Sequence, residues 1–314
     1  NRKSTMSEII TEEIPDSLAG ERLDRIVSLM AEISRADATA TIALGAVELD
    51  GVVAVSGKVR LKVGQIVAVD LSKIPQPELP GPDPSVVVDV VYSDEHIIVI
   101  NKAAGVVVHP GAGNNDKTLV NGLLALFPEI AGVGEEHRPG IVHRLDVGTT
   151  GLLIVARTQE AYEELVAMMS LREVKRHYTA LVWGHPAAPI GTIDAPIGRD
   201  PRNPLCMAVV ASGKPARTNY EVLETLSEPD VSLVACELET GRTHQIRVHL
   251  QATGHSVVGD PQYGGARMPL VIGRPFLHAG RLVFDHPLTG EPLEFTSVLP
   301  ADLEEVLKRC RDDQ

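Results

Sequence analysis

Hydrophobic residues at helical spacing open the first structured part of the chain. These apolar positions are Leu23, Ile26, Val27 and Met30. They recur at i, i+3, i+4 and i+7, which predicts an amphipathic helix. Ser34 predicts the start of a second short helix, because serine is a favoured N-cap residue. Asp50-Gly51 lies between two apolar runs and predicts a β-hairpin, and residues 66–71 predict a closing strand.

Longer apolar runs in the remaining chain predict a mixture of strands and helices. Strands are predicted at 86–91, 97–100, 152–156, 174–183, 218–223 and 232–238, and from Leu277 onward. Helices are predicted after the N-cap candidates Thr118 and Thr158, between Arg242 and Gly254, and at 301–310. The strands do not alternate regularly with helices. This pattern favours an α+β fold whose mixed, largely antiparallel central sheet is flanked by helices.

Proline and charge divide the chain into four parts. Residues 1–20 predict an irregular, acidic N-terminal arm, of which residues 1–5 precede Met6 and are expected to be an extension outside the fold. Residues 21–72 predict a small α+β domain. Five prolines in 73–85 predict a stiff linker. Residues 86–314 predict a large domain, in which the stretch 185–218 is rich in proline and glycine and is expected to hold little regular structure.

The core has to be built from aliphatic side chains, because only 3% of the 314 residues are aromatic while 44% are hydrophobic. The net charge is −13, from 29 basic and 42 acidic residues, which argues against a nucleic-acid partner. The acidic excess is concentrated at the two ends of the chain. Residues 101–282 carry 17 basic and 18 acidic residues, so the composition of this middle part is compatible with a local basic surface.

The three cysteines, Cys206, Cys236 and Cys310, are odd in number and form no CxxC pair. This usage is typical of a protein in a reducing compartment rather than of a disulfide scaffold. No apolar run approaches the ~18 residues of a membrane span, and no secretory signal is recognised near the start. The expected location is therefore the cytoplasm, with no membrane partner.

A single carboxylate stands out where a polar loop meets a predicted buried strand. Asp146 follows His143, Arg144 and Leu145 and precedes Gly148, two threonines and the apolar run 152–156. A strand holds such a side chain still while the loop keeps it accessible, which suits catalysis. The alternative is a turn aspartate that hydrogen-bonds its own backbone. The local pattern leaves both interpretations open.

Motifs for cofactor chemistry are not found in this chain. His244 and His249 are five residues apart on a predicted helix, whereas helical metal ligands favour a spacing of four. GxSxG, P-loop and GxGxxG motifs are absent from the sequence. We therefore expect no metal and no cofactor. Side chains alone remain as candidates: an ionised Asp146 beside Arg247 can act as nucleophile or base, and the ring of Tyr178 can stack on a planar substrate.

Three motifs in the large domain resemble those of the RluA/RluD-type pseudouridine synthases. They are KAAGVVVHP from Lys102, HRLDVGTTGLLIVART from His143, and GRTHQIRVHLQATGHSVVGDPQYGG from Gly241. The resemblance covers about residues 86–300, and one departure is Ala103, where the family usually has proline. Members of that family isomerise uridine to pseudouridine in ribosomal or transfer RNA without a metal or redox cofactor. The resemblance implies the same activity here.

The resemblance also implies roles for individual side chains. Asp146 is expected to attack a flipped-out uridine, Arg247 to orient and ionise that aspartate, and Tyr178 to stack on the target base. Arg144 is expected to fill the gap left in the RNA stack. The other residues expected to line the pocket or contact RNA are His109, His143, Arg242, Gln245, Ile246 and Leu277, the last two as apolar walls.

The small domain resembles the S4 RNA-binding domain in its order of two helices, a hairpin and a strand. The matching residues include Arg22-Leu23-Asp24, Ser34-Arg35 and Asp50-Gly51. S4 domains usually carry basic residues on the second helix, whereas this helix continues as ADAT from Ala36. The basic residues left to bind RNA are Lys58, Arg60 and Lys62. The alternative is a domain that packs or positions and adds little RNA affinity.

The resulting hypothesis is a cofactor-free RNA pseudouridine synthase. Its expected partner is large-subunit ribosomal RNA, with transfer RNA as the alternative substrate, and its expected state is a monomer. A second hypothesis is a non-catalytic RNA-binding or ribosome-assembly factor, against which the combination of Asp146, Tyr178 and Arg247 argues. A third hypothesis is a metal-dependent hydrolase that uses His244 and His249.

Overall fold

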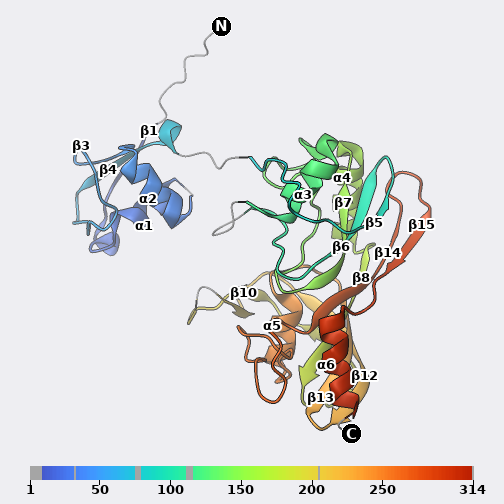
Figure 1. Cartoon of the computed structure of the whole chain (residues 1–314). Helices are drawn as coiled ribbons and strands as arrows, with labels where there is room; N and C mark the ends of the chain where they lie inside the picture. The colour runs from blue at the N-terminus through green and yellow to red at the C-terminus, as the bar shows by residue number, and fades with distance from the viewer. Residues whose placement is uncertain (1–8, 32, 75–78, 111–115, 204–205, 313–314) are drawn as a thin grey trace. The chain divides into compact units, whose positions relative to one another are not determined.

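The computed structural model describes residues 9–31, 33–74, 79–110, 116–203 and 206–312 (Figure 1). The chain divides into two compact units, Asn1–Glu78 and Leu79–Gln314. Each unit has a hydrophobic core of its own. The predicted extension 1–5 and residues 75–78 of the predicted linker lie outside the described residues.

The small unit combines helices with a short antiparallel sheet. Its elements are β1 (Ile9–Glu13), the 3₁₀ helix η1 (Asp16–Leu18), α1 (Leu23–Met30), α2 (Arg35–Ala43), β2 (Val47–Leu49), β3 (Val52–Val53), β4 (Ile66–Asp70) and the 3₁₀ helix η2 (Leu71–Lys73). The strands lie in the order β1-β4-β2-β3. Both helices place their buried apolar residues in the same core as β2 and β4, as the sequence spacing predicts for the first helix.

Local sequence sets the helix start and the turn of this unit. Ser34 Oγ accepts a hydrogen bond from the Asp37 N–H at 3.1 Å, which caps α2. Asp50 and Gly51 have φ angles of 52° and 75°, the left-handed conformations that a two-residue hairpin turn requires. The predicted cap and hairpin are therefore confirmed.

The prediction of an irregular arm over residues 1–20 is wrong for residues 9–13, which form β1. This strand pairs antiparallel with β4, from Ile9 opposite Asp70 to Glu13 opposite Ile66. Its side chains are exposed except at Ile10, so the sequence carries no alternation of apolar and polar residues there. Backbone hydrogen bonds at the edge of the sheet hold the strand instead.

The large unit is built on a mixed sheet. The strands of this sheet are β5 (Val90–Ser93), β6 (Ile97–Lys102), β7 (Thr150–Ala156), β8 (Lys175–Trp183), β9 (Ile190–Asp194), β12 (Arg217–Ser227), β13 (Asp230–Leu238), β14 (Leu277–Asp285) and β15 (Pro292–Thr296). Their order is β5-β6-β7-β14-β8-β13-β12-β9, with β15 paired to β14. In the described part of the chain, β7 runs parallel to β14 and the other pairs are antiparallel. The predicted α+β class with a largely antiparallel sheet is confirmed.

Helices flank both halves of this sheet. They are α3 (Leu119–Leu126), the 3₁₀ helix η3 (Pro128–Ile130), α4 (Gln159–Leu171), α5 (Gln245–Ala252) and α6 (Ala301–Asp312). In Figure 1, α3 and α4 lie beside β5, β6 and β7, whereas α5 and α6 lie beside the half that contains β12 and β13. The predicted N-caps are confirmed: Thr118 forms a capping box with Asn121, and Thr158 Oγ1 accepts the Ala161 N–H at 3.2 Å.

The interior strand β7 lies between β6 and β14, and its seven residues are all buried. Gly151 has a φ of 115°, and a Cβ placed there would lie 2.2 Å from the carbonyl oxygen of Ala279 in β14. Glycine therefore lets β14 run directly alongside β7. This contact fixes the start of β7 and with it the end of the loop that contains Asp146.

Three predictions about the large unit are corrected. Residues 185–218 contain β9, β10 (Ile197–Arg199) and β11 (Met207–Val209), the last two forming a separate antiparallel pair, so this stretch is more regular than expected. The predicted strand at 86–91 begins at Val90 instead. The linker ends earlier than predicted, because Gly81 and Asp83 hydrogen-bond to the side chain and carbonyl of Asn121 in α3.

A buried lysine joins the turn after β6 to the loop before β7. Lys102 is 2% exposed, and its Nζ donates to the carbonyl oxygens of Ala103, Val106 and Val147 at 2.9, 2.8 and 3.4 Å. Burial lowers the pKa of Lys102 to about 8, a decrease that the charge of Asp146 opposes. Arg274 reinforces it.

Lys102 makes the stability of the large unit depend on pH. Its pKa of about 8 in the folded chain is lower than the value of about 10.4 in an unfolded chain. Between these two pKa values the unfolded chain binds more protons than the folded chain. The contribution of Lys102 to the unfolding free energy therefore rises as the pH increases through this range, by on the order of 3 kcal/mol. Urea denaturation of the wild type and Lys102→Met between pH 7.5 and 10 measures it. We expect the rise to be smaller in the variant, and equal slopes would contradict the assignment.

Two leucines on α3 offer a matched test of the core. Leu123 is fully buried and Leu126 is 54% exposed. Leu123→Ala is expected to lower the unfolding free energy by about 2–5 kcal/mol, because it leaves a cavity. Leu126→Ala is expected to change it by less than about 0.5 kcal/mol. Chemical denaturation compares the two, and similar losses would show that α3 is not packed as described.

Candidate active site

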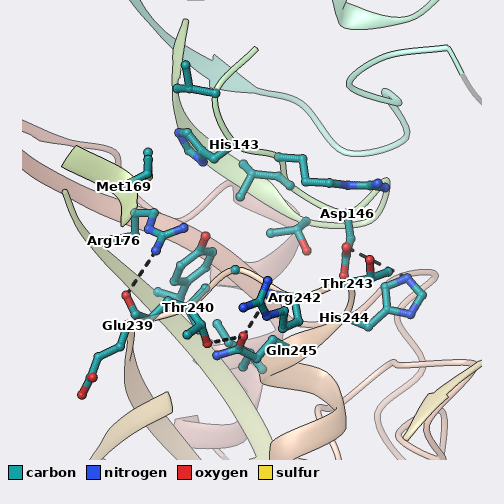
Figure 2. A pocket seen from close by; sticks show the side chains of 18 of the residues that line it. His143, Asp146, Met169, Arg176, Glu239, Thr240, Arg242, Thr243, His244 and Gln245 are labelled. Atoms are coloured by element: carbon teal, nitrogen blue, oxygen red, sulfur yellow. Dashed lines mark hydrogen bonds and ion pairs between the residues drawn. The ribbon is translucent and has the colours of Figure 1, made fainter. Parts of the chain in front are cut away.

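A cavity of about 530 Å³ in the large unit gathers the site residues that the sequence predicts there (Figure 2). Its wall is formed by the loop before β7, by α4 and β8, by the end of β13 and the turn that follows, by the first turn of α5 and by the start of β14. The predicted residues on this wall are His109, His143, Arg144, Asp146, Tyr178, Arg242, Gln245, Ile246, Arg247 and Leu277. Three further predicted RNA contacts, Lys58, Arg60 and Lys62, belong to the small unit.

Asp146 lies in the loop before β7 with its side chain 15% exposed. Its Oδ2 accepts a hydrogen bond from Arg247 Nη1 at 3.1 Å, and its Oδ1 lies 4.0 Å from His244 Nε2. Figure 2 shows this side chain directed toward His244. The turn is closed by the backbone, since the Thr149 N–H donates to the carbonyl oxygen of Asp146 at 3.0 Å. The carboxylate thus faces partners from α5, and the interpretation of a side chain bonded to its own turn is wrong.

Arg247 is held by two carboxylates and an amide. Its Nε and Nη2 donate to Asp260 at 2.6 and 2.9 Å, and Nη2 also donates to Gln262 Oε1 at 2.9 Å. The guanidinium lies over the ring of Tyr263, with its Cζ 4.9 Å from the ring centroid. Burial opposes the charge of Arg247, but the hydrogen bonds and charges of Asp260 and Asp146 raise its pKa above its usual value. Arg247 is therefore a fixed cation.

Asp260, Gln262 and Tyr263 are site residues that the sequence interpretation missed. They lie in the segment GDPQYGG, whose glycines and proline predict only turns. Asp260 is fully buried and accepts backbone N–H groups from Gln262 and Tyr263 at 2.9 and 3.2 Å. The turn prediction is correct but incomplete, because the same carboxylate also holds Arg247. The turn pattern gives no signal of that second role; the available signal was the position of these residues within the third motif that resembles the family.

Tyr178 and two apolar side chains form the dry part of the wall. Tyr178 on β8 is 5% exposed, and Ile246 and Leu277 are each 3% exposed. Burial raises the pKa of Tyr178 to about 12, while Arg176 opposes and Asp146 adds to this increase. The phenol therefore stays neutral near pH 7. A neutral ring beside aliphatic side chains suits stacking on a flat, uncharged group.

His244 approaches the second oxygen of Asp146. It begins α5 in the left-handed conformation, with φ 57°, which is uncommon for a residue other than glycine. Its Nδ1 lies 2.8 Å from the hydroxyl of Tyr263, and that oxygen accepts the Met207 N–H at 3.0 Å. When the Tyr263 hydroxyl donates to Nδ1, the imidazole proton is on Nε2 and is directed toward Asp146. Burial lowers the pKa of His244, although Asp146 opposes this decrease, so the neutral form is favoured.

The metal hypothesis for His244 and His249 is wrong for this pair. His249 is fully buried, with Nδ1 2.9 Å from Thr218 Oγ1 and Nε2 2.9 Å from the carbonyl oxygen of Ala195. Both ring nitrogens of His249 are thus occupied within the protein. Over the described ranges, no three His, Cys, Asp or Glu side chains are grouped as metal ligands would be.

Gln245 and Arg242 on the cavity wall differ in how many of their hydrogen-bonding groups are already paired within the protein. Gln245 accepts from Thr240 Oγ1 and the Arg242 N–H, and its amide group donates to Arg217 and Thr218, so its hydrogen bonds are made within the protein (Figure 2). Arg242 Nε donates to the carbonyl oxygen of Pro215 at 3.0 Å, although the residue is exposed. Gln245 therefore shapes the wall. Its predicted contact with RNA stays a prediction.

His109, His143 and Arg144 also line the cavity. His109 Nδ1 lies 3.0 Å from the carbonyl oxygen of Pro110, and Arg144 is exposed. His143 Nε2 accepts the Ile154 N–H of β7 at 3.0 Å, which anchors its ring to the central strand. Burial, aided by the charge of Arg176, lowers the pKa of His143 to about 3 and keeps it neutral.

None of the helices within the described residues combines the length and apolar character that a membrane crossing needs.

Comparison with known proteins matches this fold and site to one family. The family model for RNA pseudouridylate synthase matches residues 96–252, which include Asp146, Tyr178 and Arg247. An uncharacterized RNA pseudouridine synthase of Chloroflexus aurantiacus is 47% identical over 306 residues, covering 95% of this chain and 93% of that protein. Ribosomal large subunit pseudouridine synthase D of Pseudomonas aeruginosa is 44% identical over 315 residues, covering 96% of each.

A solved structure shows a similar fold. Human RNA pseudouridylate synthase domain containing 1 aligns with a TM-score of 0.55 at 30% identity, covering 73% of this chain and 97% of that one. The family match, the relatives and the shared fold agree with one another. The chain therefore belongs to the RNA pseudouridine synthase family and is an enzyme that isomerises uridine in RNA.

Proposed function

We propose that this enzyme isomerises uridine in large-subunit ribosomal RNA and that Asp146 begins the reaction. The observation that carries the proposal is the Asp146–Arg247 pair, 3.1 Å apart on the wall of a cavity that also contains Tyr178. Several relatives support the choice of RNA, among them the Pseudomonas aeruginosa protein, because they are named ribosomal large subunit pseudouridine synthase D.

The chemistry needs an oriented anion and no net redox change. Isomerisation breaks the bond between C1′ and N1, forms one between C1′ and C5, and moves a proton from C5 to N1. An ionised Asp146 can attack C1′, add to C6 or remove a proton from the sugar. We assign the step to Oδ1, because Oδ2 is bound to Arg247 at 3.1 Å whereas the partner of Oδ1, His244, is 4.0 Å away.

The target base has to leave the RNA stack to reach this cavity. Extruding a base costs a few kcal/mol, and contacts in the pocket offset that cost. The neutral ring of Tyr178 and the aliphatic side chains of Ile246 and Leu277 offer a surface for the uracil ring. Arg144 is exposed on the same wall and can occupy the space that the base leaves.

We further propose that the small unit is an S4-like domain that binds RNA, and that the enzyme is a cytoplasmic monomer. Arg35 on α2 donates to the buried Asp24 at 2.8 Å, so its charge is balanced within the fold. Arg60 donates to the carbonyl oxygen of Gly20 at 2.8 Å. Lys58 and Lys62 are exposed and are the better candidates for phosphate contacts. The three free cysteines suit a reducing compartment.

Asp146→Asn tests the role of the carboxylate. The amide keeps the shape but removes the anion, so we expect activity to fall by about 10⁴-fold or more, with the fold unchanged. Purified protein is incubated with ribosomal RNA from cells that lack it, and carbodiimide-resistant adducts map new pseudouridines. Asp312→Asn, an exposed site on α6, is the matched control and should retain full activity.

The same assay separates the possible substrates. For this purpose transfer RNA from the same cells is incubated in parallel. New adducts in large-subunit ribosomal RNA support the proposal, whereas adducts confined to transfer RNA would replace ribosomal RNA as the substrate. Full activity of Asp146→Asn would remove Asp146 from the mechanism. Absence of adducts in any RNA with the wild type would overturn the proposed function itself.

Lys58 and Lys62 provide a test of the small unit. Each phosphate contact releases counterions, so removing two contacts should make the dependence of log K on log salt shallower by about 1–2. We expect this for the double variant Lys58→Ala and Lys62→Ala, measured by RNA binding between 50 and 300 mM KCl (roughly the range in which such contacts respond). Lys308→Ala on α6 is the control. An unchanged slope in the double variant would mean that Lys58 and Lys62 do not bind RNA phosphates and that the small unit adds little RNA affinity.

A further inference from the structure

Arg176 is a buried cation for which the described part of the protein supplies no counterion. It lies on β8 and is 7% exposed, yet no carboxylate of the described residues forms an ion pair with it. Its one hydrogen bond there runs from Nη2 to the carbonyl oxygen of Leu238 at 3.4 Å, and its Nε is buried without a partner. Arg247, on the same cavity wall, has two carboxylates and an amide.

The contacts that the described residues supply to Arg176 do not offset the cost of burying its charge. A guanidinium removed from water needs an opposite charge or a full set of acceptors, and an unpaired donor adds a further desolvation cost. Glu239 also lines the cavity, but its carboxylate is shared between Arg172 at 2.5 Å and Arg217 at 3.2 Å. A ligand that brings its own negative charge would complete the surroundings of Arg176.

Three of the four buried, unpaired side-chain atoms among the described residues belong to residues that line this cavity. Among the described residues, the buried side-chain atoms without a hydrogen-bond partner are His96 Nδ1, His143 Nδ1, Thr149 Oγ1 and Arg176 Nε. The last three belong to residues that line the cavity. His143 Nε2 accepts the Ile154 N–H, so the ring proton of His143 is on Nδ1, which makes this atom a donor. The donors Arg176 Nε and His143 Nδ1 and the hydroxyl of Thr149 thus lack a hydrogen-bond partner within the described residues.

The position of Arg176 relates it to the reacting centre. Arg176 and Tyr178 are two residues apart on β8, so their side chains leave the same face of the strand. Figure 2 shows Arg176 and His143 at one end of the pocket and Asp146 and His244 at the other. An anion beside Arg176 is therefore kept apart from the anionic Asp146 while a planar group lies against Tyr178.

We propose that Arg176, with His143 Nδ1–H as a second donor, binds a backbone phosphate of the RNA beside the target nucleotide. The proposal rests on the proposed function, because it takes RNA as the occupant of the cavity. A phosphate suits the site better than a base carbonyl, because only the phosphate carries the charge that a buried guanidinium lacks, and the planar fork of arginine fits its oxygens. Base recognition by Tyr178 and backbone recognition by Arg176 then come from one strand.

Space around the guanidinium is limited on one side by Gly241. A Cβ built at Gly241 would lie 3.0 Å from Arg176 Nη1. A side chain at this position would therefore press on the guanidinium and move it. Gly241→Ala is expected to weaken RNA binding in the same direction as loss of Arg176, but by less.

The experiment combines protein variants with neutralised phosphates. Single methylphosphonate linkages are placed at each position around the target uridine in a ribosomal RNA fragment that the wild type modifies. We expect one linkage to weaken wild-type binding by about 10- to 100-fold, the loss typical of a hydrogen bond to a charged group. Arg176→Gln should bind the unmodified RNA correspondingly less tightly and lose little more at that same linkage, as a double-mutant cycle requires of contacting groups.

Stability distinguishes a binding role from a structural one. If Arg176 only supports the fold, Arg176→Gln should lower the melting temperature. If it awaits a phosphate, the variant should melt at the wild-type temperature or above, because an uncompensated buried charge has been removed. Lys175→Gln is the matched control, since it removes one charge from the neighbouring, outward-facing position of β8. Arg176→Lys keeps the positive charge but lacks the planar guanidinium, so we expect it to bind RNA with intermediate affinity. This variant replaces Arg176→Gln in the binding experiment if the glutamine variant does not fold.

The outcomes are distinct from those of the proposed function. Additive losses at every linkage in Arg176→Gln, or a lower melting temperature with unchanged RNA affinity, would overturn the phosphate assignment while leaving the isomerase intact. Stabilisation of the wild type by inorganic phosphate, without sensitivity to any linkage, would assign the site to a free anion and overturn the RNA proposal. Failure of the wild type to modify the fragment would instead contradict the proposed function.

Discussion

The geometry of the cavity depends on how one guanidinium is shared between two carboxylates. Asp260 is fully buried and takes two hydrogen bonds from Arg247, which fixes the side chain, while Asp146 takes one and remains partly open. Buried opposite charges favour each other's ionised form. The rigid carboxylate thus holds the cation, and the cation holds the carboxylate that faces the cavity. His244 and Tyr263, beside the same pair, give the arrangement its second support.

Local charge matters more here than the total. A net charge of −13 argues against a nucleic-acid partner, yet the cavity wall carries Arg144, Arg176, Arg242 and Arg247. The acidic residues concentrate elsewhere in the sequence, and several of those near the site, such as Glu239, are already paired with arginine. The arginines of the site therefore differ in how many of their donors are paired within the protein. Arginines with paired donors support the structure, and those with unpaired donors remain available to a ligand.

Much of the fold could be predicted because its signals are local. The helix caps at Ser34, Thr118 and Thr158 and the Asp50-Gly51 turn depend on residues within a few positions of each other. The strand β1 could not be found in this way, because it is held by backbone pairing with the distant β4 and buries few side chains. The strands β9, β10 and β11 within 185–218 are only three to five residues long and also bury few side chains. Edge strands of this kind carry little periodicity.

The site divides along the same line. Asp146, Tyr178 and Arg247 could be named because whole motifs resemble a known family, whereas composition and spacing left the role of Asp146 open. Arg176 lies outside the three motifs, and Asp260 lies within the third motif but was given no role there. Their character follows from burial and from the number of partners, quantities that appear only when β8, α5 and the turn after α5 are brought together. The alternative hypothesis of a metal site at His244 and His249 could be rejected in the same way, since both ring nitrogens of His249 are occupied by groups from distant segments.

The place of β14 between β7 and β8 also orders events in time. Thr150 and His278, which hydrogen-bond where β7 and β14 run side by side, are 128 residues apart in the chain. Until β14 has been synthesised, the position between β7 and β8 in the sheet cannot be filled. Pairings between strands so distant in the sequence also form slowly. Asp146 meanwhile lacks its guanidinium, which lies 101 residues further on. The site can therefore form only after the segments that contain Arg247 and β14 have been synthesised.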